Sequence, residues 1–344
     1  MTDNEISIRF AVHNDVDKIM KAINDHWDAN HILAHNKDFF LYIFCGDGNQ
    51  INMVIGEERS TGEIFGFLGF VKYNSSDCPD IALILWKAVD GKDAILGVKL
   101  LFFLVKNVRH ELISTVGTNP KTALPIYKSL KYNVGRLEHY YRISDKKEYK
   151  IAKIADKHIL PIADDSWDIL RFPDFETFKS KIDDSKLCEM YPHKDKYYFN
   201  HRFFAHPIFH YMVYAITSKD IDTIPAFFVC REVEKFGAKI LRIIDYIGKE
   251  SYFSFLASPL QKLMDMNNYE YMDCYCCGMF EKTMNDAGFV LRGENDPNVI
   301  PNYFEPFLSQ NGDIYYFSNK TDNFRAFKGD ADQDQPRMFD RTFL

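Results

Sequence analysis

Residues 80–89 read Asp80-Ile-Ala-Leu-Ile-Leu-Trp-Lys-Ala-Val89, an apolar run that predicts a buried β-strand. A polar loop, Asp90-Gly-Lys-Asp-Ala94, follows it and leads into an apolar helix that opens at Ile95-Leu-Gly97. A second short strand, 112–116, precedes Gly117-Thr-Asn-Pro120, and the proline suits the first turn of another helix. This order places backbone N–H groups at a helix N-terminus beside a strand end, where an anion such as a pyrophosphate can bind.

Two motifs in this stretch resemble those of the GNAT (Gcn5-related) N-acyltransferases. The phosphate loop of that family reads Arg/Gln-x-x-Gly-x-Gly/Ala, and Lys92-Asp-Ala-Ile-Leu-Gly97 stands in that frame, with Lys and Ile replacing two of its positions. The family then has an Asn after its fifth strand, followed by Ala-x-x-x-Tyr-x-x-x-Gly-Phe. At that spacing stand Asn119, Ala123, Tyr127 and Lys131-Tyr132, with Lys for Gly and Tyr for Phe. Both motifs occur in the family's order.

The resemblance implies acyl transfer from coenzyme A to an amine. A hydrogen-bond donor must then stabilise the thioester oxygen, and the leaving thiolate needs a proton. Tyr127 stands where the family places a Tyr beside the sulfur, so it is the expected proton donor, with simple packing as the alternative. The carbonyl donor is expected at the Ala88–Val89 end of the strand. The residues expected to bind coenzyme A are Ala88, Val89, Lys92, Ala94, Leu96, Gly97, Val98 and Asn119.

Length, charge and composition narrow the class of protein. The 344 residues favour two domains, and a net charge of −7 without a long basic run disfavours nucleic-acid binding. The N-terminus lacks the features of a signal peptide, and the longest apolar segment, 94–105, is too short to cross a membrane. Seven cysteines without framework spacing favour reduced thiols. We therefore expect a cytoplasmic globular protein.

Residues 26–35, His26-Trp-Asp-Ala-Asn-His-Ile-Leu-Ala-His35, concentrate three histidines and a tryptophan in ten positions. One interpretation is a helix corner with Trp27 buried. The resemblance implies another, because the first two helices of GNAT proteins line the acceptor side. His31 and His35 could also share a helix face and bind zinc, but no nearby residues complete a ligand set, so no metal is expected. The candidates for a catalytic base are His31, His35 and Asp245, and water could also carry the proton.

The second half repeats the order strand, strand, helix, strand, helix, and residues 282–289 end on Gly-Phe as the GNAT helix does. We therefore predict an α/β fold with mixed sheets, made of two tandem GNAT-like domains, 1–145 and 146–344, with a cleft between them. The second domain lacks a glycine phosphate loop after Ile247, so it is expected to have lost coenzyme A binding. Residues 191–214 are expected to open its sheet. The tail beyond Thr321 is expected to be poorly ordered at its end.

For the acceptor, the chain resembles bacterial N-acyltransferases of surface-polysaccharide pathways, including O-antigen and lipopolysaccharide biosynthesis. These act on nucleotide-linked amino sugars such as dTDP-3-amino-3,6-dideoxyhexoses. Such a ligand needs an aromatic ring and cations. The expected acceptor residues are Trp27, Asn200, Arg202, Tyr303 and Phe304. A buried ion pair is the alternative for Arg202. Two other functions stay open: a peptidoglycan-type aminoacyl transferase and a non-catalytic acyl-CoA-binding protein.

Overall fold

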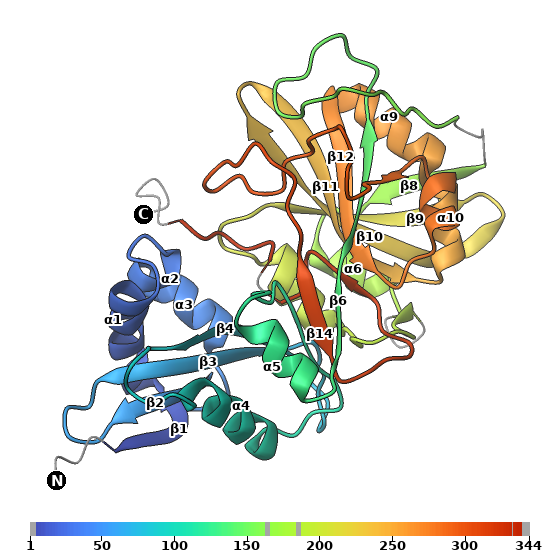
Figure 1. The fold of residues 1–344 in the computed structure, drawn as a ribbon. Helices are drawn as coiled ribbons and strands as arrows, with labels where there is room; N and C mark the ends of the chain where they lie inside the picture. The colour runs from blue at the N-terminus through green and yellow to red at the C-terminus, as the bar shows by residue number, and fades with distance from the viewer. Residues whose placement is uncertain (1–4, 162–165, 184–186, 332, 339–344) are drawn as a thin grey trace. The chain divides into compact units, whose positions relative to one another are not determined.

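A computed structural model describes residues 5–161, 166–183, 187–331 and 333–338. The chain divides into two compact units (Figure 1). Residues 1–115 and 335–344 form the first unit, and residues 116–334 form the second. This division differs from the expected boundary at residue 145, because the strand Glu138–Ile143 (β7) pairs with Tyr269–Cys277 (β12) of the second unit.

The first unit is a sheet with helices around it. Its strand order is β1-β2-β3-β4-β5, antiparallel up to β4 and parallel between β4 and β5. Two facing glycines, Gly56 and Gly66, let a helix lie close to this sheet, since a Cβ on either would come within 2.9 Å of a Leu96 methyl. The elements are β1 (Ile6–Val12), α1 (Val16–His26), α2 (Ile32–His35), α3 (Lys37–Phe44), β2 (Gln50–Glu58), β3 (Ile64–Lys72), β4 (Ile81–Ala88), α4 (Leu96–Asn107) and β5 (Ile113–Val116).

The second unit repeats this plan on a larger scale. Its main sheet has the order β13-β7-β12-β11-β10-β9-β8, again antiparallel from β8 to β11 and parallel between β11 and β12. The strands are β6 (Asn133–Arg136), β7, β8 (Trp167–Arg171), β9 (Tyr211–Ser218), β10 (Ile221–Lys235), β11 (Ala238–Gly248), β12, β13 (Val290–Leu291), β14 (Tyr315–Ser318) and β15 (Ala326–Phe327). The helices are α5 (Ala123–Ser129), α6 (Phe175–Lys181), α8 (Lys196–Phe199), α9 (Ala257–Asn267) and α10 (Glu281–Asp286).

The two faces of the second sheet differ in chemistry. One face is apolar: Leu241, Ile243 and Cys274 pack there with Leu260 of α9 and Met284 of α10. The other face carries charged and aromatic residues that are covered by the loop 298–313. The predicted mixed α/β fold with two sheets is therefore confirmed.

Two parts of the second unit differ from the prediction. Residues 196–204 are helical, as α8 and a following π-helical turn, because Asp195 accepts a hydrogen bond from the Tyr198 N–H and starts a helix there. The segment Phe324–Asp330 is buried in the unit, whereas the end of the tail, 339–344, lies outside the described residues. The charged side chains of Phe324–Asp330 have partners inside the unit, so the polar composition of this segment did not reveal its burial.

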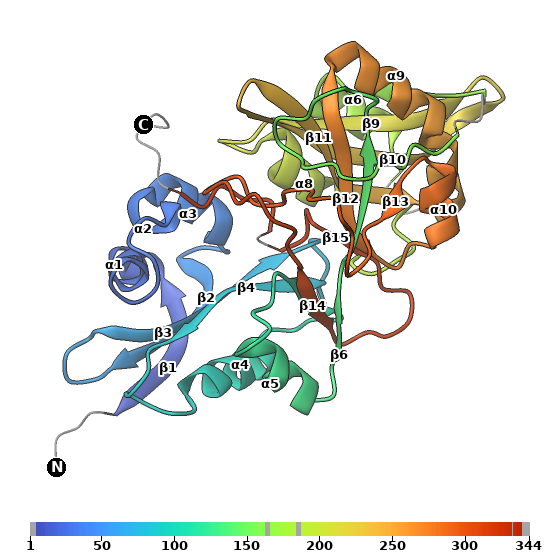
Figure 2. The same cartoon turned by 45° about the horizontal axis from the view of Figure 1, so that its top comes forward.

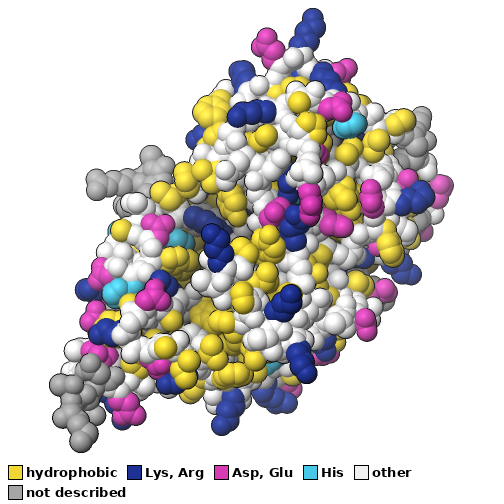
Figure 3. Space-filling view, viewed as in Figure 1, with side chains coloured by type: hydrophobic (Ala, Val, Ile, Leu, Met, Phe, Trp, Pro, Cys, Tyr) yellow, Lys and Arg dark blue, Asp and Glu magenta, His cyan; other side chains and the backbone are white. Residues whose placement is uncertain are grey.

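The surface carries side chains of both charge signs, as the sequence composition indicates. Figure 3 shows acidic and basic side chains interspersed over the face that it presents, with hydrophobic side chains over α4. Ile95 and Phe102 are among the exposed large hydrophobic residues there. No helix in the described part of the chain has both the length and the apolar character needed to span a membrane. Within the same residues, no group of three or more potential ligands could hold a metal ion.

Candidate functional site

Strands β4 and β5 of the first unit separate soon after they meet. They pair only at Ile81–Ile113 and Ala82–Ser114, and the Thr115 hydroxyl then donates to the Leu83 carbonyl at 2.6 Å. On its other edge β4 carries a β-bulge: Trp86 pairs with Leu68 and Ile84 with Gly69, so Leu85 is the extra residue, with φ of 55°. A bulge bends a strand, and a positive φ in leucine stores strain of the kind found at functional sites. The separation leaves β4 beyond Ala82 without a paired strand among the described residues of the first unit on the side of β5, which is a gap in the pairing of the sheet.

The end of β4 turns one backbone N–H toward this gap. The Val89 N–H donates to the Phe65 carbonyl of β3 at 2.8 Å. This N–H is therefore already used within the sheet and is not available to donate to the thioester carbonyl. Successive residues of a strand direct their N–H groups to opposite sides. The N–H of Ala88 therefore points away from β3. Of the Ala88–Val89 pair named from the sequence, Ala88 is the better candidate.

Helix α4 begins against this strand end. A Cβ on Gly97 would lie 3.5 Å from the Trp86 indole nitrogen and 3.6 Å from the Ala88 Cβ, which places the first turn of α4 beside the end of β4. The N–H groups of Gly97 and Val98 lie in that first turn, where a helix offers no carbonyl partner of its own. Such groups favour an anion, so Gly97 and Val98 stay candidates for phosphate binding.

Two other residues of the loop have partners within the protein. The Asp93 carboxylate accepts from the Ile95 N–H at 3.0 Å and pairs with the Lys99 ammonium at 2.6 Å, and the Asp93 carbonyl accepts from the Leu96 N–H at 3.1 Å. Lys92 extends back over the sheet, 3.4 Å from a Glu58 carboxylate oxygen and 3.9 Å from the Phe65 ring centroid. Lys92 could bind a phosphate only by leaving Glu58 and Phe65, and the Leu96 N–H only by leaving the Asp93 carbonyl. Ala94 lies exposed in the loop.

The second expected motif lies in the second unit. The Asn119 side-chain oxygen accepts from the N–H groups of Lys121 and Thr122, so Asn119 caps the turn before α5. Tyr127 is 2% exposed and stacks on Phe317 with ring centroids 3.6 Å apart. Burial raises the pKa of Tyr127 well above 10, which keeps its hydroxyl protonated at neutral pH. A protonated hydroxyl suits a proton donor, and the tight stacking equally suits packing.

The histidine corner of the first unit is a capped turn. The His31 Nδ1 accepts from the Leu33 N–H at 3.2 Å, and Trp27 stacks on His31 at 5.2 Å while staying 42% exposed. Burial and the nearby Arg337 lower the pKa of His31 to about 4. The Nε2 of His35 lies 2.6 Å from the Ala29 carbonyl, which only accepts, so this nitrogen donates. The lowered pKa makes His31 a weak base, and one of its ring nitrogens is engaged, so His31 is disfavoured as the catalytic base. Trp27 offers an exposed ring.

The second unit has the same strand separation, but its own chain fills it. Strands β11 and β12 pair from Lys239–Tyr269 to Ile243–Cys274 and then part. Residues 325–330, which we call the strap, lie between them (Figure 2). The Lys328 N–H donates to the Tyr275 carbonyl of β12 at 3.0 Å, and the Gly329 N–H donates to the Ile244 carbonyl of β11 at 2.7 Å. A Cβ on Gly329 would lie 2.5 Å from that Ile244 oxygen, so the fit is close.

Charged groups hold the strap in place. The Arg325 guanidinium donates to the Gly248 carbonyl at the end of β11 and to the Gly278 carbonyl just after β12. The Lys194 ammonium pairs with Asp245 at 2.8 Å and with Asp330 at 2.7 Å. Asp245 is fully buried, and burial raises its pKa to about 6 despite Lys194. A carboxylate enclosed in this way is a structural residue, which disfavours Asp245 as the catalytic base.

Arg202 is also engaged within the second unit. Its guanidinium is buried and donates to the Tyr211 hydroxyl at 2.8 Å, the Asp334 carbonyl at 2.7 Å and the Gly329 carbonyl. These contacts fix the strap and leave Arg202 poorly placed to hold a pyrophosphate. Asn200 lies in the same π-helical turn and is half-buried.

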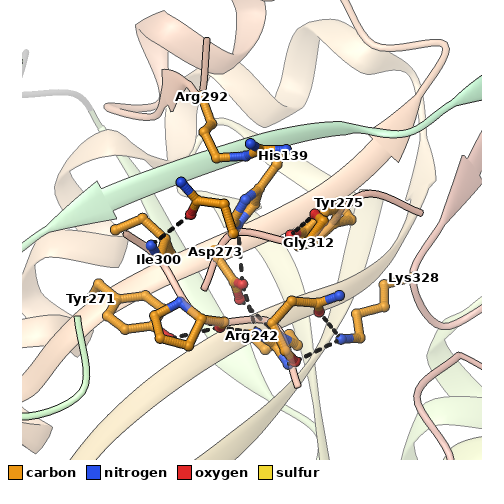
Figure 4. A network of polar contacts seen from close by, with 12 residues as sticks. His139, Arg242, Tyr271, Asp273, Tyr275, Arg292, Ile300, Gly312 and Lys328 are labelled. Carbon is orange, nitrogen blue, oxygen red and sulfur yellow. Dashed lines mark hydrogen bonds and ion pairs between the residues drawn. The ribbon is translucent and has the colours of Figure 1, made fainter. Parts of the chain in front are cut away.

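Tyr303 and Phe304 belong to a loop that a buried network anchors. Arg242 forms two hydrogen bonds to the Asp273 carboxylate and donates to the carbonyls of Pro301 and Asn302 (Figure 4). The strap residue Lys328 reaches the same Asn302 with its ammonium. Both Tyr303 and Phe304 stay half-buried. The two residues therefore follow an anchored part of the loop, and neither is fully buried.

Comparison with solved structures identifies the fold. A GCN5-related N-acetyltransferase from Anabaena variabilis superposes with a TM-score of 0.55 at 8% identity, over 91% of this chain and 72% of that one. A conserved protein of Enterococcus faecalis gives 0.55 at 9% identity over the same shares. The chain has the GCN5-related fold. Two sheets, each with parallel central strands that part, make it a tandem GNAT fold. A glucosamine N-acetyltransferase region of a fungal β-N-acetylglucosaminidase gives 0.52 at 10% identity, over 92% of this chain and 38% of that one.

Comparisons of sequence identify no family: no protein-family model matches the chain, and no curated protein matches it. The features that sequence reasoning missed are the Leu85 bulge, the turn that Asp93 forms before α4 and the strap. The aspartate two residues before Ile95 was a readable signal, because an aspartate side chain often accepts from the backbone N–H two residues on. The bulge and the strap depend on pairing between distant residues, which a single sequence does not reveal.

Proposed function

We propose that the chain is an acyl-CoA-dependent N-acyltransferase whose first unit binds the acyl donor. One observation carries this proposal: within the first unit no described strand pairs with β4 beyond Ala82 on the side next to the N-terminus of α4, whereas the matching place in the second unit is filled by the strap. A donor thioester beside β4 could accept from the Ala88 N–H, and its pyrophosphate could accept from Gly97 and Val98.

The transfer needs a neutral amine and a proton for the departing thiolate. The amine attacks the thioester carbonyl, the C–S bond breaks, and the excess proton of the amine leaves to water or to a base. In this proposal Tyr127 protonates the thiolate of coenzyme A, because it stands at the family's position and carries a protonated hydroxyl at neutral pH; its raised pKa makes it a weaker acid, which the site must offset. Because His31 and Asp245 are engaged elsewhere, water is the preferred carrier of the amine proton. His35 stays the alternative base.

For the acceptor we propose the amine of a nucleotide-linked amino sugar, such as a dTDP-3-amino-3,6-dideoxyhexose. The resemblance described above supports it, and so does the fold similarity to a glucosamine N-acetyltransferase region. Tyr303 and Phe304, which are half-buried in the anchored loop of the second unit, can stack on a base. Since Arg202 is engaged with the strap, a different cation must pair with the pyrophosphate.

The test is release of free coenzyme A from acetyl-CoA and 3-hydroxybutanoyl-CoA with a panel of nucleotide-linked amino sugars. Release that depends on both the sugar and its amine supports the proposal, and a matched nucleotide sugar with a hydroxyl at the same carbon is the control. Turnover only with aminoacyl-tRNA would favour the peptidoglycan-type transferase. Tight binding of acyl-CoA without turnover of any acceptor would favour a non-catalytic binding protein.

Replacing Tyr303 separates the two substrates. Tyr303→Ala removes one stacking surface, worth roughly 1–3 kcal/mol by analogy with base stacking in single-strand binders, which is about 5- to 150-fold in KM for the nucleotide sugar. Tyr303→Phe keeps the ring and is the control. The KM for acyl-CoA should stay nearly constant in both variants. An equal rise in both KM values would instead indicate a general defect of the second unit.

A further inference from the structure

A carboxylate of the protein already lies just before the first residue of α4. Asp93 places one carboxylate oxygen 3.0 Å from the Ile95 nitrogen and the other 2.6 Å from the Lys99 ammonium. These are the contacts that a bound phosphate would make: a backbone N–H at a helix start and a nearby cation. The Lys99 hydrogen bond, and then the Ile95 N–H, lower the pKa of Asp93, so the carboxylate is ionised at neutral pH.

We propose that Asp93 is an internal competitor of the donor's pyrophosphate, and that it sets the affinity of the site for coenzyme A. The inference rests on the proposed function, since it assumes that the donor's phosphates approach the start of α4. Bound phosphate displaces the Asp93 carboxylate from Lys99 and from the helix N-terminus. The cost of that exchange weakens the hold on both acyl-CoA and the product coenzyme A. Asp93 is a positioning residue in this scheme, because it controls N–H groups and a cation without contacting the reacting carbonyl.

The rest of the loop supports this role. Lys92, which stands at the arginine or glutamine of the phosphate-loop frame, is turned away toward Glu58. Lys99 is thus the cation that lies closest along the chain to the first turn of α4, and Asp93 occupies it. The N–H groups of Gly97 and Val98 stay directed outward from the first turn. A site built this way binds phosphate only as far as it can release its own carboxylate.

The test compares wild type with Asp93→Asn by calorimetric titration with coenzyme A and, separately, with pantetheine, which lacks the pyrophosphate. Asparagine keeps a side-chain oxygen for the Ile95 N–H, so the turn before α4 is preserved, but it removes the negative charge. We expect coenzyme A to bind about 3- to 30-fold more tightly to Asp93→Asn, because a like charge within a few ångströms of the phosphate is gone. Pantetheine should bind both proteins equally. Binding of coenzyme A to the variant should also weaken more steeply with added salt.

Asp90→Asn is the matched control. Asp90 lies exposed in the same loop and, in the described part of the chain, makes none of the contacts that Asp93 makes with α4. The same loss of charge there should change the affinity for coenzyme A less than twofold. In turnover, Asp93→Asn should lower the KM for acyl-CoA, whereas a variant that only loosened α4 would raise it.

The outcomes separate the inference from the proposed function. If wild type binds coenzyme A and Asp93→Asn binds it equally or more weakly, the inference is wrong and the donor site stands. An equal gain for pantetheine, or an equal gain from Asp90→Asn, also overturns it. If only Asp93→Asn binds, the inference is supported in its strongest form. If neither protein binds coenzyme A, the donor assignment and the inference fail together.

Discussion

The two places where parallel strands part, β4 from β5 and β11 from β12, share a backbone plan and differ in what occupies them. Both carry a bulge at the same point: Leu85 is the extra residue in β4, and Ile244 is the extra residue in β11. The N–H of the strap residue Gly329 donates to the carbonyl of the bulge residue Ile244. Within the first unit, no described strand pairs with β4 beyond Ala82 on that side. A duplicated fold has thus kept its geometry in both copies and closed one of them with its own chain.

The helices after β5 and β12 show the same relation. In both, the second residue after the helix has a positive φ, 63° at Lys131 and 86° at Gly288. The next N–H donates to the carbonyl five residues back, from Tyr132 to Tyr127 and from Phe289 to Met284. The position of Tyr127 in α5 is therefore held by Met284 in α10. Where α5 has a hydroxyl, α10 has a thioether that packs in the apolar core. The helix that follows the filled strand pair thus lacks the proposed proton donor.

The largest expected effect comes from loosening the strap. Lys194→Met leaves the buried carboxylates of Asp245 and Asp330 without their cation, which should lower the free energy of unfolding of the second unit by about 3–5 kcal/mol. Denaturant unfolding followed by the fluorescence of Trp167, which lies in the second unit, measures it. Lys179→Met on the exposed side of α6 is the control and should cost less than about 0.5 kcal/mol. Equal losses for both variants would mean that the strap is not held by charge.

The next effect concerns the pair Tyr127 and Met284. Tyr127→Phe keeps the ring on Phe317 and removes only the hydroxyl, so kcat should fall roughly 10- to 1000-fold while the affinity for coenzyme A changes little. Met284→Leu at the matching position should leave kcat unchanged and cost less than about 1.5 kcal/mol of stability. Unchanged turnover in Tyr127→Phe would make Tyr127 a packing residue, like its counterpart.

A smaller effect is expected at the first turn of α4. Gly97→Asp adds a negative charge there, and affinity for coenzyme A should fall by about tenfold or more. Gly97→Ala is the control, because its Cβ would meet Trp86 and Ala88 only at ordinary contact distances of 3.5 and 3.6 Å. Calorimetric titration decides it. Unchanged affinity in Gly97→Asp would remove the donor from the first unit and end the asymmetry between the two copies.

The smallest effect is a pH dependence that each unit contributes separately. Burial lowers the pKa of His31 in the first unit and of His139 in the second to about 4. The unfolded chain titrates near 6.5, so as the pH falls from about 6.5 toward 4 it binds protons that the folded chain excludes, and stability falls. We expect a loss of about 1–3 kcal/mol for each histidine across this range. Unfolding curves between pH 7 and 4.5 test it, with His31→Gln as a variant whose curve should fall less steeply.

Elements that depend on neighbouring residues could be predicted from the sequence, whereas features that depend on pairing between distant residues could not. The apolar run at 80–89, the polar loop and the Gly-Phe ending at Phe289 each predicted an element from neighbouring residues, and the duplicated order followed. The aromatic run around Tyr198 resembled a strand, yet Asp195 capped a helix there. Nothing in residues 138–143 indicates that they pair with β12 rather than with the first sheet. Arg202 and Asp245 were predicted to be functional because of their chemistry. In the structure Arg202 donates to carbonyls of the C-terminal tail, and Asp245 shares the Lys194 ammonium with Asp330 of the strap.

The strap also determines when the second unit can fold. Its strands β11 and β12 are made well before Ala326, and at roughly 5–20 residues per second the nascent chain carries them for a few seconds before the strap exists. During that time the parted strand edges around Ile244 and Tyr275 lack their partners, and unpaired edges are prone to join other strands. The half-built sheet of the second unit is therefore exposed to mispairing until the strap is made.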